Sequence, residues 1–282
     1  MIKPLEAPGP RLRPLAPHGM VVCPNCSRHF LGERWEAGLR VCPACGAHTR
    51  VPAWLRAGQL ADADSLDAVH LAIDDRDPLS FDDGIPYPDR VRDARIDVGV
   101  EEAVVVARAN IEGLPVIIAS MEFGFLGGSL GGAAGEAFAR ACELAAEERR
   151  GLVAVCVSGG ARMQEGIASL AQMARCTAGV STVAKARLPY VSILCDPCFG
   201  GVTASFATQA DVILAEPRAR IGFAGGRVIE QATHERLPEH FQTAEFLLSH
   251  GMVDAVVVRA ELRPVIGRVL CAYGGGPHRD IS

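Results

Sequence analysis

The chain alternates between short apolar runs and amphipathic stretches over most of its length. Two runs, Leu152–Val157 and Tyr190–Cys195, have the length and composition of strands. A second pair, Glu102–Arg108 and Leu114–Ser120, is separated by a turn at Glu112-Gly113 and predicts two consecutive strands. The pattern therefore predicts a sheet whose strands are spread along the chain.

Helical periodicity follows these runs. From Gly135 to Arg150 the apolar residues fall on one side of a helix, as Phe138, Cys142 and Ala145 illustrate. We also expect helices at about 162–185, 202–209, 227–236 and 241–250, and a strand at Asp211–Ala215. Repeated strand–turn–helix units with glycine at the same ends predict a layered α/β fold with its active site along those ends.

Two of the strands end in paired glycines, Gly159-Gly160 and Gly200-Gly201. A strand that ends in glycines and opens a helix leaves backbone N–H groups unpaired, and the helix dipole favours negative charge there. Such a turn can hold an oxyanion, and two of them suggest chemistry that passes through an enolate or a tetrahedral anion. Alternatively, Gly-Gly makes a tight turn and lets a helix pack closely on a strand.

Length and composition indicate one main domain with a small additional module. The chain has 282 residues, of which 49% are hydrophobic and 5% aromatic, as in a compact α/β protein. Its beginning lacks the apolar stretch of a signal peptide, and no later segment reaches the roughly 18 apolar residues of a membrane span. We therefore expect a cytoplasmic protein with no membrane association, whose ten cysteines are thiols or metal ligands.

Four cysteines near the N-terminus have the spacing of a metal site. Cys23, Cys26, Cys42 and Cys45 form C-x2-C-x15-C-x2-C, which predicts two knuckles that complete a tetrahedral sulfur shell for one structural Zn²⁺. So short a module has little core, and metal binding should supply much of its stability.

Charge is unevenly divided. Residues 1–56 contain eight Lys or Arg and three acids, whereas the whole chain has a net charge of −5. A basic N-terminal segment followed by an acidic remainder is consistent with binding to nucleic acid or to a phosphorylated cofactor. It is also consistent with a charged surface that contacts only solvent.

Three further patterns bear on the chemistry of the chain. Cys195 and Cys198 form a third C-x2-C, which is typical of a redox pair but lacks the rest of a thioredoxin pattern. Gly127–Gly131 satisfies the G-x-S-x-G of serine hydrolases, for which His234, His240 or His250 would be the base. No Gly-Lys dipeptide occurs, which excludes a P-loop.

Several segments together resemble the carboxyltransferase β subunit of bacterial acetyl-CoA carboxylase, from Cys23 to about Ala272. They are the four-cysteine ribbon, Glu122–Ser129, Ser158–Gly166, Gly200–Ala207, Ala215–Pro217, Ile221–Gly225 and Arg227–Gln231. The resemblance implies a crotonase-like (ClpP/crotonase superfamily) ββα superhelix behind the zinc ribbon. We expect a flexible tail at 1–20, the ribbon at 21–56, the carboxyltransferase domain at 57–273 and a flexible tail at 274–282.

The family reaction moves CO2 from carboxybiotin to acetyl-CoA and gives malonyl-CoA. The resemblance implies an α2β2 assembly with a separate α subunit, and biotin supplied by a biotin carboxyl carrier protein that biotin carboxylase loads. The only lysines, Lys3 and Lys185, lack the setting for biotin attachment. A related subunit for another acyl thioester, or a zinc-ribbon nucleic-acid-binding protein, are the alternatives.

Both the ureido oxygen and the thioester oxygen gain negative charge in this reaction, so it needs two oxyanion holes and no nucleophile. By resemblance, the backbone amides of Gly200 and Gly201 form one hole, and the α subunit supplies the other. The resemblance also assigns contacts with acyl-CoA to Gly159, Gly160, Ala161, Arg162, Gly127 and Gly128. Arg162 would pair either with a CoA phosphate or with Glu165 inside the fold.

Overall fold

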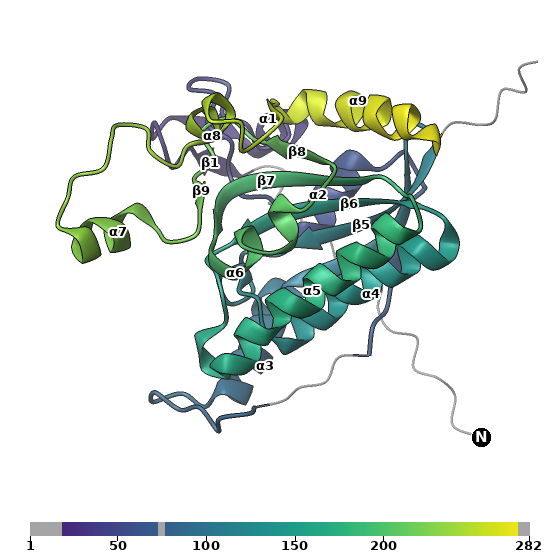
Figure 1. Ribbon diagram of the computed structural model, residues 1–282. Coiled ribbons are helices and arrows are strands. Elements are labelled where there is room, and N and C mark those ends of the chain that lie inside the picture. Colours follow the sequence, from purple (N-terminus) through teal and green to yellow (C-terminus); the bar gives the residue numbers. More distant parts are fainter. Residues whose placement is uncertain (1–18, 73–76, 276–282) are drawn as a thin grey trace, which may run out of the picture.

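The computed structural model describes residues 19–72 and 77–275, which form an N-terminal ribbon packed on an α/β body (Figure 1). The strands are β1 (Met20–Val22), β2 (His29–Leu31), β3 (Asp67–Val69), β4 (Val104–Ile111), β5 (Leu114–Met121), β6 (Gly151–Ser158), β7 (Tyr190–Phe199), β8 (Val212–Ala215), β9 (Ile221–Gly222) and β10 (Ala255–Val256). The α-helices are α1 (Gly32–Ala37), α2 (Ala53–Leu60), α3 (Tyr87–Val98), α4 (Gly132–Glu148), α5 (Ile167–Lys185), α6 (Gly200–Thr203), α7 (Gly226–Thr233), α8 (Ala244–Ser249) and α9 (Arg259–Leu270). The tails expected at 1–20 and 274–282 lie almost entirely outside these residues.

One mixed sheet forms the centre of the body, in the order β10-β8-β7-β6-β5-β4-β3. Strands β5, β6, β7, β8 and β10 run parallel, while β4 and β3 add an antiparallel edge, and the short β9 pairs with the end of β7. Every residue of β6 is buried, as expected for a central parallel strand covered on both faces. The predicted α/β sheet is confirmed, and β7 extends four residues beyond the predicted end at Cys195.

Helices cover both sides of this sheet. The small and apolar face of α4 packs against β4, β5 and β6, and α5 packs along α4 (Figure 1). The ribbon and α9 lie on the opposite side (Figure 1). Helix α2 contacts β4 and β5, and Ala53, Ala57 and Leu60 are buried in the main core. The boundary expected between the ribbon at 21–56 and the domain at 57–273 therefore falls inside α2, a helix that packs on the body.

The helix expected from residue 162 is shorter than predicted. A 3-10 turn occupies Met163–Glu165, and α5 begins only at Ile167, after Gly166 with φ +54°. Arg162 and Glu165 point into the protein interior, so these residues form a buried turn rather than the first turn of an amphipathic helix. Likewise, the helix expected at 202–209 is divided into α6 and a 3-10 turn at Phe206–Thr208.

A buried carboxylate joins the ribbon to the body. Glu216, at the end of β8, is 1% exposed and accepts hydrogen bonds from Arg56 on α2 at 2.5 Å and from Arg259 on α9 at 2.8 Å. The same Arg259 guanidinium donates to the carbonyl oxygens of Leu39 and Thr49 in the ribbon. One ion-pair cluster therefore holds α2, α9 and the ribbon together.

This cluster predicts a loss of stability in acid. Burial by itself would raise the pKa of the Glu216 carboxyl, but the adjacent charge of Arg56 and the donors around it hold that pKa well below its ordinary value of 4.5. The stabilisation is complete above the ordinary pKa and is lost as pH falls toward the lowered one. We expect the free energy of unfolding, measured in urea from about pH 7 to about pH 3, to fall less steeply in Glu216→Gln than in the native chain. Glu261→Gln, on the exposed face of α9, is the control; equal slopes in all three proteins would contradict the prediction.

Candidate active site

The two Gly-Gly turns meet at the end of the sheet. Gly200 has φ +61°, and a Cβ atom built on it would lie 2.7 Å from the Cα atom of Gly160. Gly160 itself has φ +126°. A side chain at Gly200 would therefore require both an unfavourable backbone conformation and a separation of the two turns. The close approach brings the segments after β6 and β7 into direct contact.

The amides of these turns are only partly available. The Gly200 N–H donates to the carbonyl oxygen of Phe223 at 2.9 Å, and the Gly160 N–H donates to the Ser158 hydroxyl at 3.0 Å. By contrast, the amides of Ala161 and Gly201 have no hydrogen-bond acceptor among residues 19–72 and 77–275. The prediction of two free amides in the Gly200-Gly201 turn is thus wrong for Gly200. The two amides without a protein acceptor are thus one from each turn, that of the half-buried Ala161 and that of the buried Gly201.

A third glycine segment packs beside the first two. The Gly159 N–H donates to the Gly127 carbonyl oxygen at 2.9 Å, and a Cβ atom on Gly128 would lie 2.4 Å from the carbonyl oxygen of Val157. Leu130 pairs with Ala161 as an isolated parallel bridge. In this conformation Gly128 serves close backbone packing, whereas Gly127, with φ +70°, has open space where a Cβ atom would lie, and Gly159 is exposed.

Arg162 is not free to contact a phosphate. Its side chain is fully buried, and each of its N–H groups has a protein acceptor. Two carboxylate bonds go to Glu102, one bond goes to the Tyr87 hydroxyl, and the remaining two go to the hydroxyl and carbonyl oxygens of Ser129. Of the two predicted roles for Arg162, the geometry therefore favours the one inside the fold, with Glu102 as the main partner and Glu165 at 3.7 Å.

The Arg162 cluster fixes the glycine segments. Glu165 accepts a hydrogen bond from the Tyr87 hydroxyl at 2.5 Å and another from the Gly132 amide at 2.6 Å. Burial raises the pKa of the Tyr87 hydroxyl, so Tyr87 stays protonated and donates. Sequence reasoning did not identify Tyr87 or Glu102. The signal for Glu102 was an acid at the start of an apolar strand, where it is 2% exposed.

Two alternative chemistries lose their support in this geometry. Ser129, the central residue of the G-x-S-x-G pattern, is bonded to Arg162 rather than to a base, and His234, His240 and His250 are exposed. Cys195 and Cys198 are buried, and burial raises the pKa of each thiol to about 12. Thiols with such a pKa are poor nucleophiles, which argues against a redox pair.

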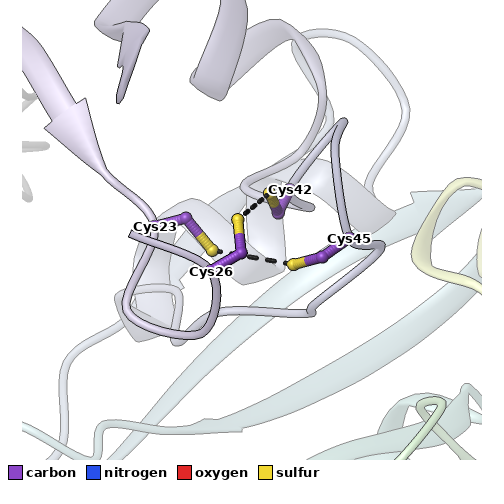
Figure 2. Close-up of side chains that lie close together, drawn as sticks. All are labelled: Cys23, Cys26, Cys42 and Cys45. Carbon is purple, nitrogen blue, oxygen red and sulfur yellow. Dashed lines mark hydrogen bonds between the residues drawn. The ribbon is translucent and has the colours of Figure 1, made fainter. Parts of the chain in front are cut away.

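The four ribbon cysteines converge as predicted. Figure 2 shows that the sulfurs of Cys23, Cys26, Cys42 and Cys45 point toward one another, and all lie within 4.8 Å of each other. The Cys23–Cys45 and Cys26–Cys42 sulfur pairs are 3.8 and 3.7 Å apart. This arrangement can hold one metal ion.

Exposed apolar side chains lie next to the glycine turns. Met163, Ile167 and Leu170, which we call the α5 stripe, are 69%, 82% and 50% exposed. Phe223, whose carbonyl oxygen accepts from Gly200, is 69% exposed, and α7 buries none of its side chains and projects away from the body (Figure 1). Large apolar side chains exposed in this number are typical of a surface that another protein covers. Within the described residues, no helix has the length and apolarity to cross a membrane.

Comparison with known proteins identifies the family. The carboxyl transferase domain family matches residues 69–249. The chain is 51% identical over 269 residues to the acetyl-coenzyme A carboxylase carboxyl transferase subunits beta/alpha of Parafrankia sp. (strain EAN1pec), covering 94% of this chain and 44% of that protein. It is 48% identical to the corresponding subunit beta of Gloeobacter violaceus (strain ATCC 29082 / PCC 7421), covering 94% of this chain and 88% of that protein. The chain thus spans less than half the length of the beta/alpha relative.

Solved structures agree with this assignment. The Pseudomonas malonate decarboxylase MdcD-MdcE hetero-dimer matches 82% of this chain and 90% of its own, with a TM-score of 0.61 and 29% identity. Transcarboxylase 12S matches 84% of this chain and 42% of its own, with a TM-score of 0.63 and 24% identity, which supports the fold. The predicted crotonase-like α/β fold is confirmed. The chain belongs to the carboxyl transferase family, as a homologue of the acetyl-coenzyme A carboxylase carboxyl transferase β subunits.

Proposed function

We propose that this chain is the β subunit of the carboxyltransferase component of an acetyl-CoA carboxylase. In this role it would transfer CO2 from carboxybiotin, held on a separate carrier protein, to acetyl-CoA and give malonyl-CoA for fatty acid synthesis. The Gloeobacter violaceus relative, 88% of whose length is covered by the match, is named as this subunit. The observation that carries the proposal on the chain itself is the pair of open amides, Ala161 and Gly201, where two strand ends meet.

These two amides would stabilise the enolate oxygen of the acyl thioester. When the α-proton leaves, negative charge moves to the thioester oxygen, and fixed N–H donors lower the energy of that state more than that of the ground state. The contact between Gly160 and Gly200 holds the two donors in place before the substrate binds. The Gly200 amide itself positions the turn through its hydrogen bond to the Phe223 carbonyl oxygen.

Carboxybiotin on the carrier protein supplies both the CO2 and, after its release, the base that takes the proton. This chain therefore needs to supply neither a nucleophile nor a general base, consistent with the occupied hydroxyl of Ser129 and the buried thiols of Cys195 and Cys198. Its residues bind and orient the acyl thioester and hold the developing charge.

The metal that we infer for the ribbon is one structural Zn²⁺. Tetrahedral coordination with Zn–S bonds of about 2.3 Å requires sulfurs about 3.8 Å apart. The observed separations of 3.7 and 3.8 Å fit that shell, and four thiolates match the preference of zinc. The ion would stabilise the ribbon and would take no part in the chemistry.

A separate α subunit is the partner that we propose for the α5 stripe and α7. The matched beta/alpha relatives are named for both subunits, and the malonate decarboxylase neighbour is a hetero-dimer. An α2β2 assembly would cover the exposed apolar side chains beside the glycine turns and would bring the second oxyanion hole to the site.

Ten unpaired cysteines support a reducing, cytoplasmic location.

The test is an assay of the full chain co-expressed with the α subunit of the same cell. We expect carboxyl transfer from malonyl-CoA to a free biotin derivative, which runs the proposed reaction in reverse. Propionyl- and longer acyl-CoA substrates in the forward direction report the acyl preference. No transfer with any acyl-CoA, together with RNA binding that falls steeply with salt, would instead favour a nucleic-acid-binding protein.

A further inference from the structure

The short strand β9 holds the glycine turn that follows β7. The Gly200 N–H donates to the carbonyl oxygen of Phe223, directly after β9, at 2.9 Å. The Cys198 N–H donates to the carbonyl oxygen of Arg220, directly before β9, also at 2.9 Å. Two amides at and just after the end of β7 are thus bound to the β9 segment. The direction of the next amide, that of Gly201, therefore depends on where β9 lies.

Pairing alone does not give β9 a firm place. The strand has two residues, Ile221 and Gly222, and each pairs with one residue of β7. On the other side of the strand, the Ile221 N–H donates to the carbonyl oxygen of Gln242, in the loop before α8, at 2.8 Å. So few backbone bonds give little resistance to local opening, and further anchors decide the position of β9.

A carboxylate on β7 supplies such an anchor. Asp196 Oδ1 accepts hydrogen bonds from the backbone N–H of Arg220 at 3.0 Å and from its Nε at 2.8 Å, while Oδ2 accepts from its Nη2 at 3.0 Å. One side chain of β7 therefore binds both the main chain and the side chain of the residue before β9. Because the carbonyl oxygen of Arg220 also accepts from Cys198, both peptide groups of Arg220 are bound to β7.

The backbone bond is the part of this contact that restrains β9. The side chains of Asp196 and Arg220 are 34% and 58% exposed, and an ion pair in contact with water contributes little to the stability of a fold. The backbone N–H of Arg220, by contrast, lies one residue before β9, so a bond to it restrains the strand itself. Substitutions in a pair as exposed as this one should leave the overall fold intact.

Asp196 does not lie at the open amides. It precedes Gly200 by four residues, a span of about 13 Å along an extended strand. Among the residues that the structure describes, its carboxylate forms hydrogen bonds with Arg220 alone. Its influence on the turn therefore passes through β9.

We propose that Asp196 is a positioning residue, which fixes the Gly200-Gly201 turn through β9. Its carboxylate holds β9 beside β7, where the Phe223 carbonyl oxygen engages the Gly200 amide. The Gly201 amide is thereby left open for the substrate oxygen. The part of this inference that concerns carboxyl transfer rests on the proposed function.

The test compares three variants of the full chain assembled with its α subunit. Asp196→Ala removes the whole anchor, and kcat for carboxyl transfer should fall about tenfold, a part of the 10²–10³-fold cost of losing a donor outright. Asp196→Asn keeps an acceptor oxygen for the Arg220 amide and should recover most of this loss. Arg220→Gln keeps the backbone N–H and should stay close to the native rate. The KM for acyl-CoA should be unchanged in all three, because a displaced donor is missed mainly in the transition state.

Asp254→Ala is the matched control. The Asp254 carboxylate likewise accepts a hydrogen bond from a strand amide, that of Ile213, at 2.7 Å. This contact lies at the start of β8, which pairs with the start of β7 and is therefore at the opposite end of the sheet from the glycine turns. We expect native kcat and KM in this variant.

Hydrogen exchange of the backbone amides gives a second measurement, which does not depend on turnover. In Asp196→Ala the Gly200 amide should exchange faster than in the native chain, because its bond to Phe223 opens more often. In Asp196→Asn and Asp254→Ala the exchange of this amide should stay close to native.

The possible outcomes separate this inference from the proposed function. Native exchange at Gly200 in Asp196→Ala, or native kcat in a complex that does transfer carboxyl groups, would overturn the positioning role and leave the proposed function intact. An equal change of KM in Asp196→Ala and Asp196→Asn, with native kcat, would show a direct effect of charge on substrate binding and would also overturn it. Faster exchange at Gly200 in Asp196→Ala, within a complex that transfers no carboxyl group, would support the positioning role and reject the proposed function.

Discussion

Gly200→Ala is expected to lower the rate of carboxyl transfer by about 10²–10³-fold, the usual cost of losing one oxyanion donor. Gly200 has φ +61°, and the added Cβ would lie 2.7 Å from the Cα atom of Gly160. Relief of that clash separates the two turns and moves the Ala161 and Gly201 amides apart. The loss should appear in kcat, because the donors act most strongly on the developing charge.

A matched substitution separates this effect from a general response to alanine. Gly58→Ala lies on the exposed side of α2, where an added Cβ meets no atom within 4 Å, and should leave the rate unchanged. Gly201→Val offers a second variant, because its Cβ contacts Met173 and Leu130 at 3.4–3.5 Å and the extra methyl groups would crowd them. We expect it to abolish transfer while metal content and subunit assembly persist. Near-native turnover in both Gly200→Ala and Gly201→Val would remove this turn from the mechanism.

Arg162→Met is expected to reduce the free energy of unfolding by about 3–5 kcal/mol. Methionine fills much of the volume but leaves the Glu102 carboxylate, which is 2% exposed, without its bidentate partner. It also frees the Tyr87 hydroxyl and the oxygens of Ser129 from their donor. Urea unfolding of the native chain and the variant at neutral pH measures the difference.

A double variant identifies the cause of this loss. Arg162→Met combined with Glu102→Gln removes the uncompensated charge and should recover a large part of the stability. Arg140→Met, whose ion pairs with Glu143 and Glu147 lie on the solvent-exposed side of α4, should change the free energy of unfolding by at most about 1 kcal/mol. An Arg162→Met effect as small as that of Arg140→Met would contradict the structural role of the cluster.

The apolar runs predicted the sheet well because parallel central strands are buried on both faces. Leu152–Val157 and Tyr190–Cys195 both lie within observed strands, and the four-cysteine spacing predicted the cluster of sulfurs. These features are local, since each depends on residues close together in sequence. The start of the helix expected at about residue 162 was predicted less well. Because Arg162 and Glu165 are buried, residues 163–165 form a 3-10 turn instead of the first turn of that helix.

Long-range contacts account for what the sequence could not show. Arg162 pairs mainly with Glu102, 60 residues away, and lies 3.7 Å from the neighbouring Glu165, the only partner inside the fold that was expected from the sequence. The use of the Gly200 amide by Phe223 depends on how a later loop folds back over β7. The ion pairs of Glu216 likewise depend on long-range contacts, because Arg56 on α2 and Arg259 on α9 both meet it at the end of β8.

The most direct test of the account is a crystal structure of the chain with its α subunit and a stable enolate analogue of acetyl-CoA. We predict that the analogue oxygen lies about 2.7–3.1 Å from the amide nitrogens of Gly201 and Ala161. An oxygen bound elsewhere, with both amides donating to protein acceptors instead, would contradict the central claim that these strand ends hold the anion.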